Sequence, residues 1–359
     1  MKVLEVISNL LPIGGGETFA VNFSCCMNDI CELKVIILYK EYTQMFIDRL
    51  NEKNIDYVIL DKQKHFDLKN AKEIRKIIKE FKPDVVHTEN NALIPAFLAI
   101  RKLKKKDRPI VYHTLHLIPQ EECSNRLVRV LYKHIFKKKN YIPVAITESL
   151  AAETKKYFKA SNVPFVENGV DLTRIPRPTK VLERRSYDIT VIGRFSYPKN
   201  YEFLINAFSL IQKSKRDFKV ALIGNGELFN SMKKLANDLD ADFIEFMGTM
   251  PNPGNILVDT KIIALGSRYE ANPLSLIEGM AAGCIVISSD VGGVKNIIKP
   301  DNGFLFEVND TETFVKKVLD ILNNIDSYNS MSKNNIQYSK NFSIEKCAAK
   351  YLELFRKKN

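Results

Sequence analysis

The segment Lys261–Ser288 (KIIALGSRYEANPLSLIEGMAAGCIVIS) contains two short apolar runs separated by a helix-like pattern. The runs Lys261–Leu265 and Cys284–Ser288 are typical of buried strands. Between them, Asn272 is expected to cap a helix whose first turn holds Pro273, where a missing N–H costs nothing. A strand, a helix and a second strand in this order predict two parallel strands joined by a crossover helix.

Two carboxylates flank the expected start of this helix. Glu270 lies in the loop that faces the start, and Glu278 lies about one turn inside a helix that Gly283 is well placed to end. The free N–H groups of Asn272–Ser275 point at the same place and attract phosphate, whereas two acids repel it. A ligand with both a phosphate and neighbouring hydroxyls satisfies both demands, and a nucleotide sugar has that composition.

The same alternation of apolar runs and helical patterns continues along the whole 359-residue chain. A chain of this length is expected to form two domains, and the alternation is typical of parallel sheets with crossover helices. We predict an α/β protein with two Rossmann-like, doubly wound domains, 1–172 and 173–342, that face a cleft. Residues 343–359 are expected to form a helix that packs back on the first domain. Because ligands bind beyond the carboxyl ends of such strands, the active site is expected in the cleft.

The expected elements follow from these patterns. The predicted strands are Val3–Ser8, Leu33–Leu38, Tyr57–Leu60, Val85–His87, Ile110–His113, Val144–Ile146, Tyr187–Ile192, Lys219–Ile223, Phe243–Met247, Lys261–Leu265, Cys284–Ser288 and Gly303–Phe306. The helices predicted in the first half are Glu17–Met27, Thr43–Asn51, Leu68–Phe81 and Ala92–Lys104. The Pro- and Arg-containing segment 173–185 is expected to link the domains.

The composition indicates a soluble globular protein. Hydrophobic residues make up 45% of the chain and charged residues 27%. No apolar run approaches the roughly 20 residues that span a bilayer, and the apolar start leads into a glycine turn rather than a cleavage site. The six cysteines lack zinc-like paired spacing. We therefore expect reduced thiols and a cytoplasmic location.

The net charge of +12 is concentrated in two segments of the first half. Residues 101–108 (RKLKKKDR) are mostly cationic, and residues 126–139 (RLVRVLYKHIFKKK) alternate cations with apolar residues. The second segment is typical of a basic amphipathic helix and indicates an anionic membrane surface as a partner. A solvated helix face is the alternative. Nucleic acid is not expected, because no recognised binding module accompanies the charge.

Several short motifs occur together in a characteristic order. They are the E-x7-E pair Glu270/Glu278, the G-R-x4-K element Gly193–Lys199, the turn Asn168–Asp171, the glycine turn Gly14–Glu17 and the pair Gly292-Gly293. Each is weak alone, but together they resemble the GT-B glycosyltransferases of family 4 over nearly the whole chain. One departure is Lys295-Asn296, where the family commonly has Pro-Glu, so sugar preference cannot be transferred from relatives.

The resemblance implies roles for residues of both halves. Arg194 and Lys199 would neutralise the departing diphosphate, Glu278 would hold the ribose hydroxyls and Glu270 the donor sugar. The expected donor-binding residues are Gly15, Gly16, Arg194, Lys199, Gly224, Glu270, Asn272, Pro273, Leu274, Ser275 and Glu278. The expected catalytic residues are Glu270, His116, Arg194 and Lys199.

The acceptor is expected to contact the first domain. His116 follows a predicted strand and matches a histidine that the family places near the transferred sugar, so it is a candidate for both acceptor binding and catalysis. Glu17 and Glu148 are the other acceptor-binding candidates. His87 and His113 lie in or at the end of strands, where a buried structural role is the favoured interpretation.

The resemblance implies a retaining transferase that moves a sugar from a nucleoside diphosphate, with UDP favoured, to a hydroxyl of a lipid-linked glycan. Capsule, exopolysaccharide or teichoic acid synthesis at the inner face of the plasma membrane is the expected setting. No cofactor or metal is expected: the D-x-D-like Asp238–Asp242 ends a predicted helix away from the ligand edge. A non-catalytic partner subunit and a nucleotide-sugar 2-epimerase on the same fold are the alternatives.

Overall fold

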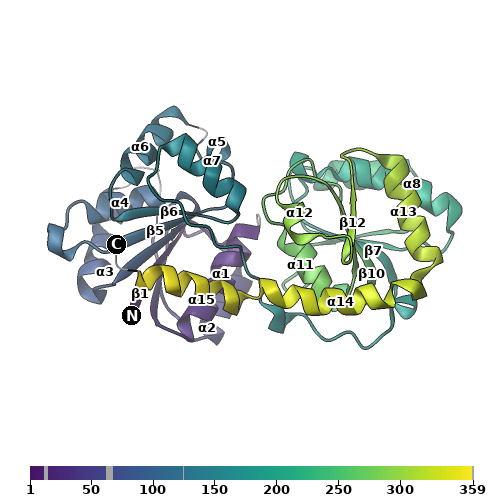
Figure 1. The fold of residues 1–359 in the computed structure, drawn as a ribbon, viewed down its shortest axis with the longest axis horizontal. Coiled ribbons are helices and arrows are strands. Elements are labelled where there is room, and N and C mark those ends of the chain that lie inside the picture. Colours follow the sequence, from purple (N-terminus) through teal and green to yellow (C-terminus); the bar gives the residue numbers. More distant parts are fainter. Residues whose placement is uncertain (12–14, 62–67, 124, 358–359) are drawn as a thin grey trace. The chain divides into compact units, whose positions relative to one another are not determined.

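A computed structural model describes residues 1–11, 15–61, 68–123 and 125–357 (Figure 1). The chain divides into two compact units: Met1–Gly169 with Ile344–Asn359, and Val170–Ser343. Each unit is built on a parallel sheet of six described strands, with helices flanking the sheet (Figure 1). The α/β prediction, with two doubly wound parallel sheets, is confirmed.

The sheet of the first unit has the strand order β3-β2-β1-β4-β5-β6. Its strands are β1 (Lys2–Ile7), β2 (Glu32–Ile37), β3 (Asp56–Ile59), β4 (Val85–Glu89), β5 (Ile110–Leu115) and β6 (Tyr141–Ala145). Its helices are α1 (Gly15–Asn28), α2 (Gln44–Glu52), α3 (Leu68–Phe81), α4 (Leu93–Ile100), α5 (Pro119–Glu122), α6 (Arg126–Phe136), α7 (Glu148–Phe158) and α15 (Ile344–Arg356). The order reverses between β1 and β4, which makes their carboxyl ends the place where doubly wound sheets bind ligands.

The sheet of the second unit has the order β12-β11-β10-β7-β8-β9, which reverses between β7 and β10. Its strands are β7 (Tyr187–Ile192), β8 (Val220–Ile223), β9 (Ile244–Gly248), β10 (Thr260–Leu265), β11 (Ile285–Ser289) and β12 (Gly303–Phe306). Its helices are α8 (Tyr201–Ser214), α9 (Phe229–Asp238), α10 (Gly254–Leu257), α11 (Leu274–Ala281), α12 (Val294–Ile297), α13 (Thr311–Asn323) and α14 (Asn329–Ser339).

The cores of both units follow from strands that are buried on both faces. Strands β4, β6, β8 and β11 are buried at every residue, as expected for parallel strands covered by helices on either side. Helix α15 completes the first unit beside α1 (Figure 1). Its buried Tyr351 hydroxyl lies 2.7 Å from Thr114 Oγ1, and the Tyr112 hydroxyl donates to the Leu354 carbonyl at 2.7 Å.

Several elements differ from the sequence-based expectation. Helix α4 ends at Ile100 rather than at residue 104, and the basic segment 101–108 that follows contains only a short 3-10 turn, Lys105–Asp107. Gly15 and Gly16 begin α1 instead of forming a turn, while Gly14 lies outside the described residues. Within the described residues, no helix has the length and apolar character needed to span a bilayer.

Candidate active site

The predicted donor residues of the second unit gather beyond the carboxyl ends of β7, β8 and β10, where the strand order reverses. Arg194 and Lys199 lie in the loop after β7, Gly224 follows β8, and Glu270 follows β10. Hydrogen bonds join the first and last of these loops: the Arg268 N–H donates to the Pro198 carbonyl at 2.7 Å. The loops therefore form one connected surface at the position where such sheets bind ligands.

The two predicted cations each have an acidic partner. The Lys199 ammonium donates to Glu270 Oε1 at 2.5 Å, with the Lys199 side chain 25% exposed and the Glu270 side chain 7% exposed. Arg194 is about half exposed and pairs with Glu227 at 3.0 Å. The tight pair is thus largely buried and fixed, whereas the Arg194 pair is open to solvent and contributes little to stability.

Glu270 is held by groups from three loops. Its Oε1 also accepts from the Ser267 hydroxyl at 2.7 Å, and its backbone carbonyl accepts from the Gly293 N–H at 3.0 Å. Gly292 has φ +49°, and a Cβ there would lie 2.0 Å from the Glu270 carbonyl oxygen. Position 292 therefore has to be glycine for this turn to pack against the Glu270 backbone, a contact that we call the Glu270 clasp.

A second close backbone approach occurs between the loops after β7 and β8. Gly224 has φ +137°, and a Cβ there would lie 2.0 Å from the Gly193 carbonyl oxygen. The same carbonyl accepts from the Tyr201 hydroxyl at 2.9 Å. The glycine lets these two loops pack directly against each other, which fixes the backbone that carries Arg194.

The start of α11 differs from the prediction at its cap. The helix begins at Leu274, and Pro273 is the N-cap residue, with φ −73° and ψ 99°. This ψ is extended, so Pro273 cannot be part of the first turn and Asn272 cannot be the cap. The Asn272 side-chain oxygen is instead buried and has no hydrogen-bond partner among the described residues. The first N–H groups of α11, at Leu274 and Ser275, have no partner within the helix.

Glu278 projects from the second turn of α11 and is half-buried. Burial raises the pKa of Glu278 to about 7, and the positive charge of Arg174 limits that rise. The carboxyl therefore changes its charge near neutral pH. A carboxylate accepts hydrogen bonds from hydroxyls, so its ionised form suits a diol better than its neutral form does.

In the first unit, His116 lies just after β5. Its Nε2 is hydrogen-bonded to Glu89 Oε2, and its Nδ1 lies 3.3 Å from Asn168 Nδ2. Because an amide nitrogen donates, Nδ1 accepts and Nε2 carries the ring proton. Burial lowers the pKa of His116, although nearby carboxylates, Glu122 foremost, oppose that change. The ring is thus a neutral group whose orientation is fixed by two neighbours.

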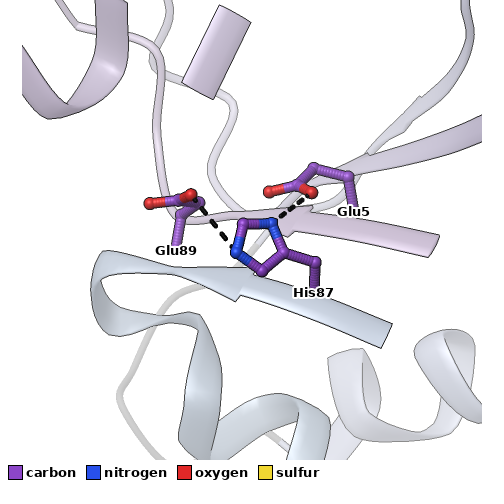
Figure 2. A group of neighbouring side chains, drawn as sticks. All are labelled: Glu5, His87 and Glu89. Carbon is purple, nitrogen blue, oxygen red and sulfur yellow. Dashed lines mark hydrogen bonds and ion pairs between the residues drawn. The ribbon is translucent and has the colours of Figure 1, made fainter. Parts of the chain in front are cut away.

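Behind His116 lies a buried network of Glu5, His87 and Glu89. Figure 2 shows the two carboxylates at opposite nitrogens of the His87 ring. Glu5 Oε2 lies 2.7 Å from Nδ1, Glu89 Oε1 lies 3.6 Å from Nε2, and Nε2 is 2.7 Å from Thr114 Oγ1. Burial alone lowers the pKa of His87, but Glu5 raises it above its ordinary value. Burial raises the pKa of Glu89 well above its ordinary value.

This network is also a candidate metal-ligand group, because the ligating atoms of Glu5, His87 and Glu89 all lie within 4.8 Å of one another. A metal ion takes one nitrogen of an imidazole together with nearby oxygens. Here the two carboxylates lie at different nitrogens of the ring (Figure 2). An ion bound at either nitrogen would therefore be coordinated by only one of the two acids. The arrangement fits a hydrogen-bonded ion pair, with Glu89 protonated, better than it fits a single ion.

A polar pocket of about 230 Å³ opens beyond the carboxyl ends of β1 and β4. It is lined by Ser8, Asn9, Glu17, Asn90, Asn91, Leu117, Glu121 and Glu122. Glu17 was predicted from the sequence and comes from the first turn of α1. Glu148, the other predicted acid, is exposed at the start of α7 and is not among the lining residues.

Most residues of this pocket escaped the sequence analysis because no motif carries them. Asn90 and Asn91 form the short turn after β4, and Glu121 and Glu122 lie in a single-turn helix. The available signal was position alone: polar residues directly after the first and fourth strands of a doubly wound sheet lie at its ligand-binding edge. Glu89, the partner of His116, ends β4 and could have been found in the same way.

Two protein-family models match this chain, one in each half. The family model described as Glycosyltransferase Family 4 matches residues 13–174, and that described as Glycosyl transferases group 1 matches residues 177–338. With two doubly wound sheets and a cation–acid site on the second, the chain is a glycosyltransferase of the GT-B class. It belongs to glycosyltransferase family 4.

Individual relatives and structures are similar over most of the chain. The UDP-Gal:α-D-GlcNAc-diphosphoundecaprenol α-1,3-galactosyltransferase of Escherichia coli is 26% identical, over 75% of this chain and 73% of that protein. The poly(ribitol-phosphate) α-N-acetylglucosaminyltransferase of Staphylococcus aureus is 24% identical, over 94% of this chain and 68% of that one. The crystal structure of Anabaena HepE in complex with UDP and glucose has the same fold, with a TM-score of 0.84 at 15% identity over 100% of both chains.

Proposed function

We propose that this glycosyltransferase is a retaining, metal-independent enzyme that moves a sugar from a UDP-sugar to a hydroxyl of a lipid-linked glycan. The observation that carries the proposal is the buried Lys199–Glu270 pair, which lies with Arg194 at the strand-order reversal of the second sheet. The name of one relative supports the donor and acceptor classes, because it is a UDP-galactose transferase to a diphosphoundecaprenol-linked sugar.

In this proposal the donor diphosphate binds near Arg194, Lys199 and the first N–H groups of α11. Cations and helix N–H groups stabilise the charge that develops on the leaving group. Glu278 accepts hydrogen bonds from the ribose hydroxyls, and Glu270 accepts from the sugar while it positions Lys199. The Asn272 oxygen, which has no described partner, is a further acceptor for donor hydroxyls.

The proposed chemical step leaves the anomeric configuration unchanged. The acceptor oxygen forms a bond to the anomeric carbon while the bond from that carbon to the diphosphate oxygen breaks on the same face. The proton of the acceptor hydroxyl passes to the departing diphosphate, whose remaining charge Arg194 and Lys199 balance. The two cations supply the countercharge that a divalent metal supplies in other phosphate chemistry.

A lipid-linked acceptor is favoured by the outer surface of α6. Leu127 and Val130 are 73% and 60% exposed and lie three residues apart, so they share one face of the helix. Arg126 and Lys137 are exposed on the same helix or at its end. Exposed apolar residues among cations are the composition of a helix that lies on an anionic membrane. We extend the proposal to synthesis of a surface polysaccharide of capsule, exopolysaccharide or teichoic acid type.

Incubation of the purified chain with UDP-glucose, UDP-galactose and UDP-N-acetylglucosamine, without acceptor, tests the proposal against its alternatives. A transferase should release UDP slowly by hydrolysis, whereas a 2-epimerase should convert its donor into an epimer. A non-catalytic subunit should do neither. One of these donors should also raise the melting temperature with the logarithm of its concentration, and failure of all three to do so would contradict a UDP-sugar site.

A further inference from the structure

We propose that the pocket at the carboxyl ends of β1 and β4 binds the acceptor's reacting residue, and that this residue is an uncharged sugar. The inference rests on the proposed transferase function and deepens it by naming the chemical class of the acceptor. The pocket lies wholly within the first unit, at the reversal of strand order in its sheet. Doubly wound sheets bind ligands at this position.

The charge of the pocket is opposite to that of the chain. The chain carries a net charge of +12. None of the eight described residues that line the pocket is a lysine, arginine or histidine, and three are glutamates: Glu17, Glu121 and Glu122. A phosphate or carboxylate in this space would meet three acids of its own sign, and no cation is among the described lining residues. The lining therefore selects against anionic acceptors such as polyol phosphates or acidic sugars.

The same lining matches the groups of a neutral sugar. Sugar hydroxyls donate to carboxylates and amide oxygens and accept from amide nitrogens, and the lining supplies three amides, at Asn9, Asn90 and Asn91. Leu117 adds an apolar surface, 43% exposed, for the C–H face of a ring. The volume of about 230 Å³ lies below the range of about 300–1,000 Å³ that is usual for drug-sized ligands, as suits a single sugar ring.

The backbone and the packing around the pocket indicate a built site. Asn90 has φ +50°, a conformation that a non-glycine residue adopts at a cost. The Asn9 side-chain oxygen is buried without a hydrogen-bond partner among the described residues. The pocket wall therefore contains a hydrogen-bond-accepting oxygen that the described residues do not satisfy. Glu122, with a side chain only 6% exposed, lies 3.8 Å from His113 and is held at the inner side.

The pocket also adjoins the His116 ring. A Cβ placed on Gly16 would lie 3.4 Å from Asn90 Oδ1 and 3.9 Å from His116 Cδ2, so the start of α1 touches both. Along the chain, the basic helix α6 follows α5 after residues 123–125. Acids that hold a neutral sugar are thus followed directly by cations suited to the phosphate of a lipid carrier.

Direct binding to the full chain tests the proposal separately from turnover. Saturation-transfer NMR in the presence of UDP would compare octyl glycosides of glucose, galactose, mannose and N-acetylglucosamine with octyl glucuronide and ribitol 5-phosphate. At least one neutral glycoside should show contact with the protein, and the anions should show at least about tenfold weaker binding. Tighter binding of an anionic probe, or contact by no neutral glycoside, would overturn the proposal. UDP binding by itself reports on the donor site, so failure there would count against the proposed function instead.

Two variants localise the binding. Asn91 and Glu121 are both exposed, so Asn91→Ala and Glu121→Lys should fold. Each should raise the KM for the neutral glycoside about tenfold, with the UDP dissociation constant unchanged. The matched control is Glu80→Lys, an exposed acid of α3 in the same unit, which should change neither quantity. Unchanged glycoside binding in both pocket variants would place the acceptor elsewhere and refute the assignment.

Discussion

The Lys199 ammonium lies 2.5 Å from the Glu270 carboxylate, and that carboxylate also accepts from the Ser267 hydroxyl. An acid and a cation that come from loops after different strands therefore form a preset pair. Because the Lys199 side chain is 25% exposed and Glu270 only 6%, the pair is largely shielded from water, and its orientation is fixed. In the proposed reaction a donor diphosphate meets a cation that is already positioned, so little reorganisation is needed at the moment of transfer.

The two glutamates of the E-x7-E pair should respond differently to substitution. Glu278→Gln should weaken UDP-sugar binding, whereas Glu270→Ala should chiefly lower kcat because Lys199 loses its anchor. Since the pKa of Glu278 is raised to about 7, the affinity of wild type should fall as the pH drops from 8 to 6 and the carboxylate gains a proton. Calorimetry with a UDP-sugar across this range should show that dependence in wild type and lose it in Glu278→Gln. The opposite slope would mean that the neutral acid is the binding form.

The Glu270 clasp predicts that two glycine-to-alanine substitutions differ in their effect on donor binding. Gly292→Ala and Gly248→Ala both place a side chain at positive φ, +49° and +66°, and this backbone strain should cost each about 1–2 kcal/mol of stability. Gly292→Ala should lose more, because its Cβ would lie 2.0 Å from the Glu270 carbonyl oxygen. A methyl at Gly248 meets nothing within 4 Å, but one at Gly292 meets the Glu270 carbonyl. Only Gly292→Ala should also weaken donor binding, as thermal shift with a UDP-sugar would report. Equal donor affinity in the two variants would argue against the clasp.

The buried network of the first unit predicts a loss of stability as pH rises above the ordinary pKa values of Glu89 and His87. The pKa of Glu89 is raised in the folded protein, so its stabilising proton is present at low pH and is lost as pH rises through that value. His87, whose pKa is also raised, acts in the same direction. Glu89→Gln copies the protonated acid and should lose less stability than wild type does as pH rises above the ordinary glutamate range. Urea denaturation measures this, with Glu80→Gln as the exposed control, and an unchanged slope in Glu89→Gln would exclude the protonated state.

Membrane contact through α6 predicts selective binding to anionic vesicles. Leu127→Ser with Val130→Ser should reduce sedimentation with phosphatidylglycerol vesicles, and Lys137–Lys139→Ala should remove about 1 kcal/mol per lysine. High salt should weaken the lysine contribution more than the apolar one. The control is Val181→Ser, an apolar residue 50% exposed in the second unit. Equal transfer to lipid-linked acceptors with and without intact lysines would exclude a role for this surface.

Three elements have the bounds that the sequence predicts, although their burial differs. In β7 and β12 a short apolar run sets both ends, and in α3 the helical spacing of Ile74, Ile77 and Ile78 sets the buried face. The start of α11 was displaced by one residue: Pro273 suits a first helical turn, yet its ψ of 99° is set by the loop before it. That loop is shaped by tertiary contacts of Glu270, which no local pattern contains.

The candidate site likewise contains residues that the sequence predicts and partners that it does not. Arg194, Lys199, Glu270 and Glu278 could be found because a spaced motif carries them, and the structure brings the middle two into contact. The pairing of Arg194 with Glu227 and of His116 with Glu89 depends on which strand ends are neighbours in the sheet. Strand order is a property of the fold rather than of any segment. The position of Glu89 at a strand end could therefore be read from the sequence, but both pairings are visible only once the sheet is assembled.

Release of UDP from a UDP-sugar, measured with and without a neutral octyl glycoside, tests the central claim most directly. The wild-type chain should release UDP faster when the glycoside is present and form a product with the donor's anomeric configuration. Lys199→Met should lose that stimulation by about a hundredfold or more, while Lys233→Met, at an exposed lysine of α9, should keep it. Release that ignores the glycoside, or that survives in Lys199→Met, would contradict transfer at this site.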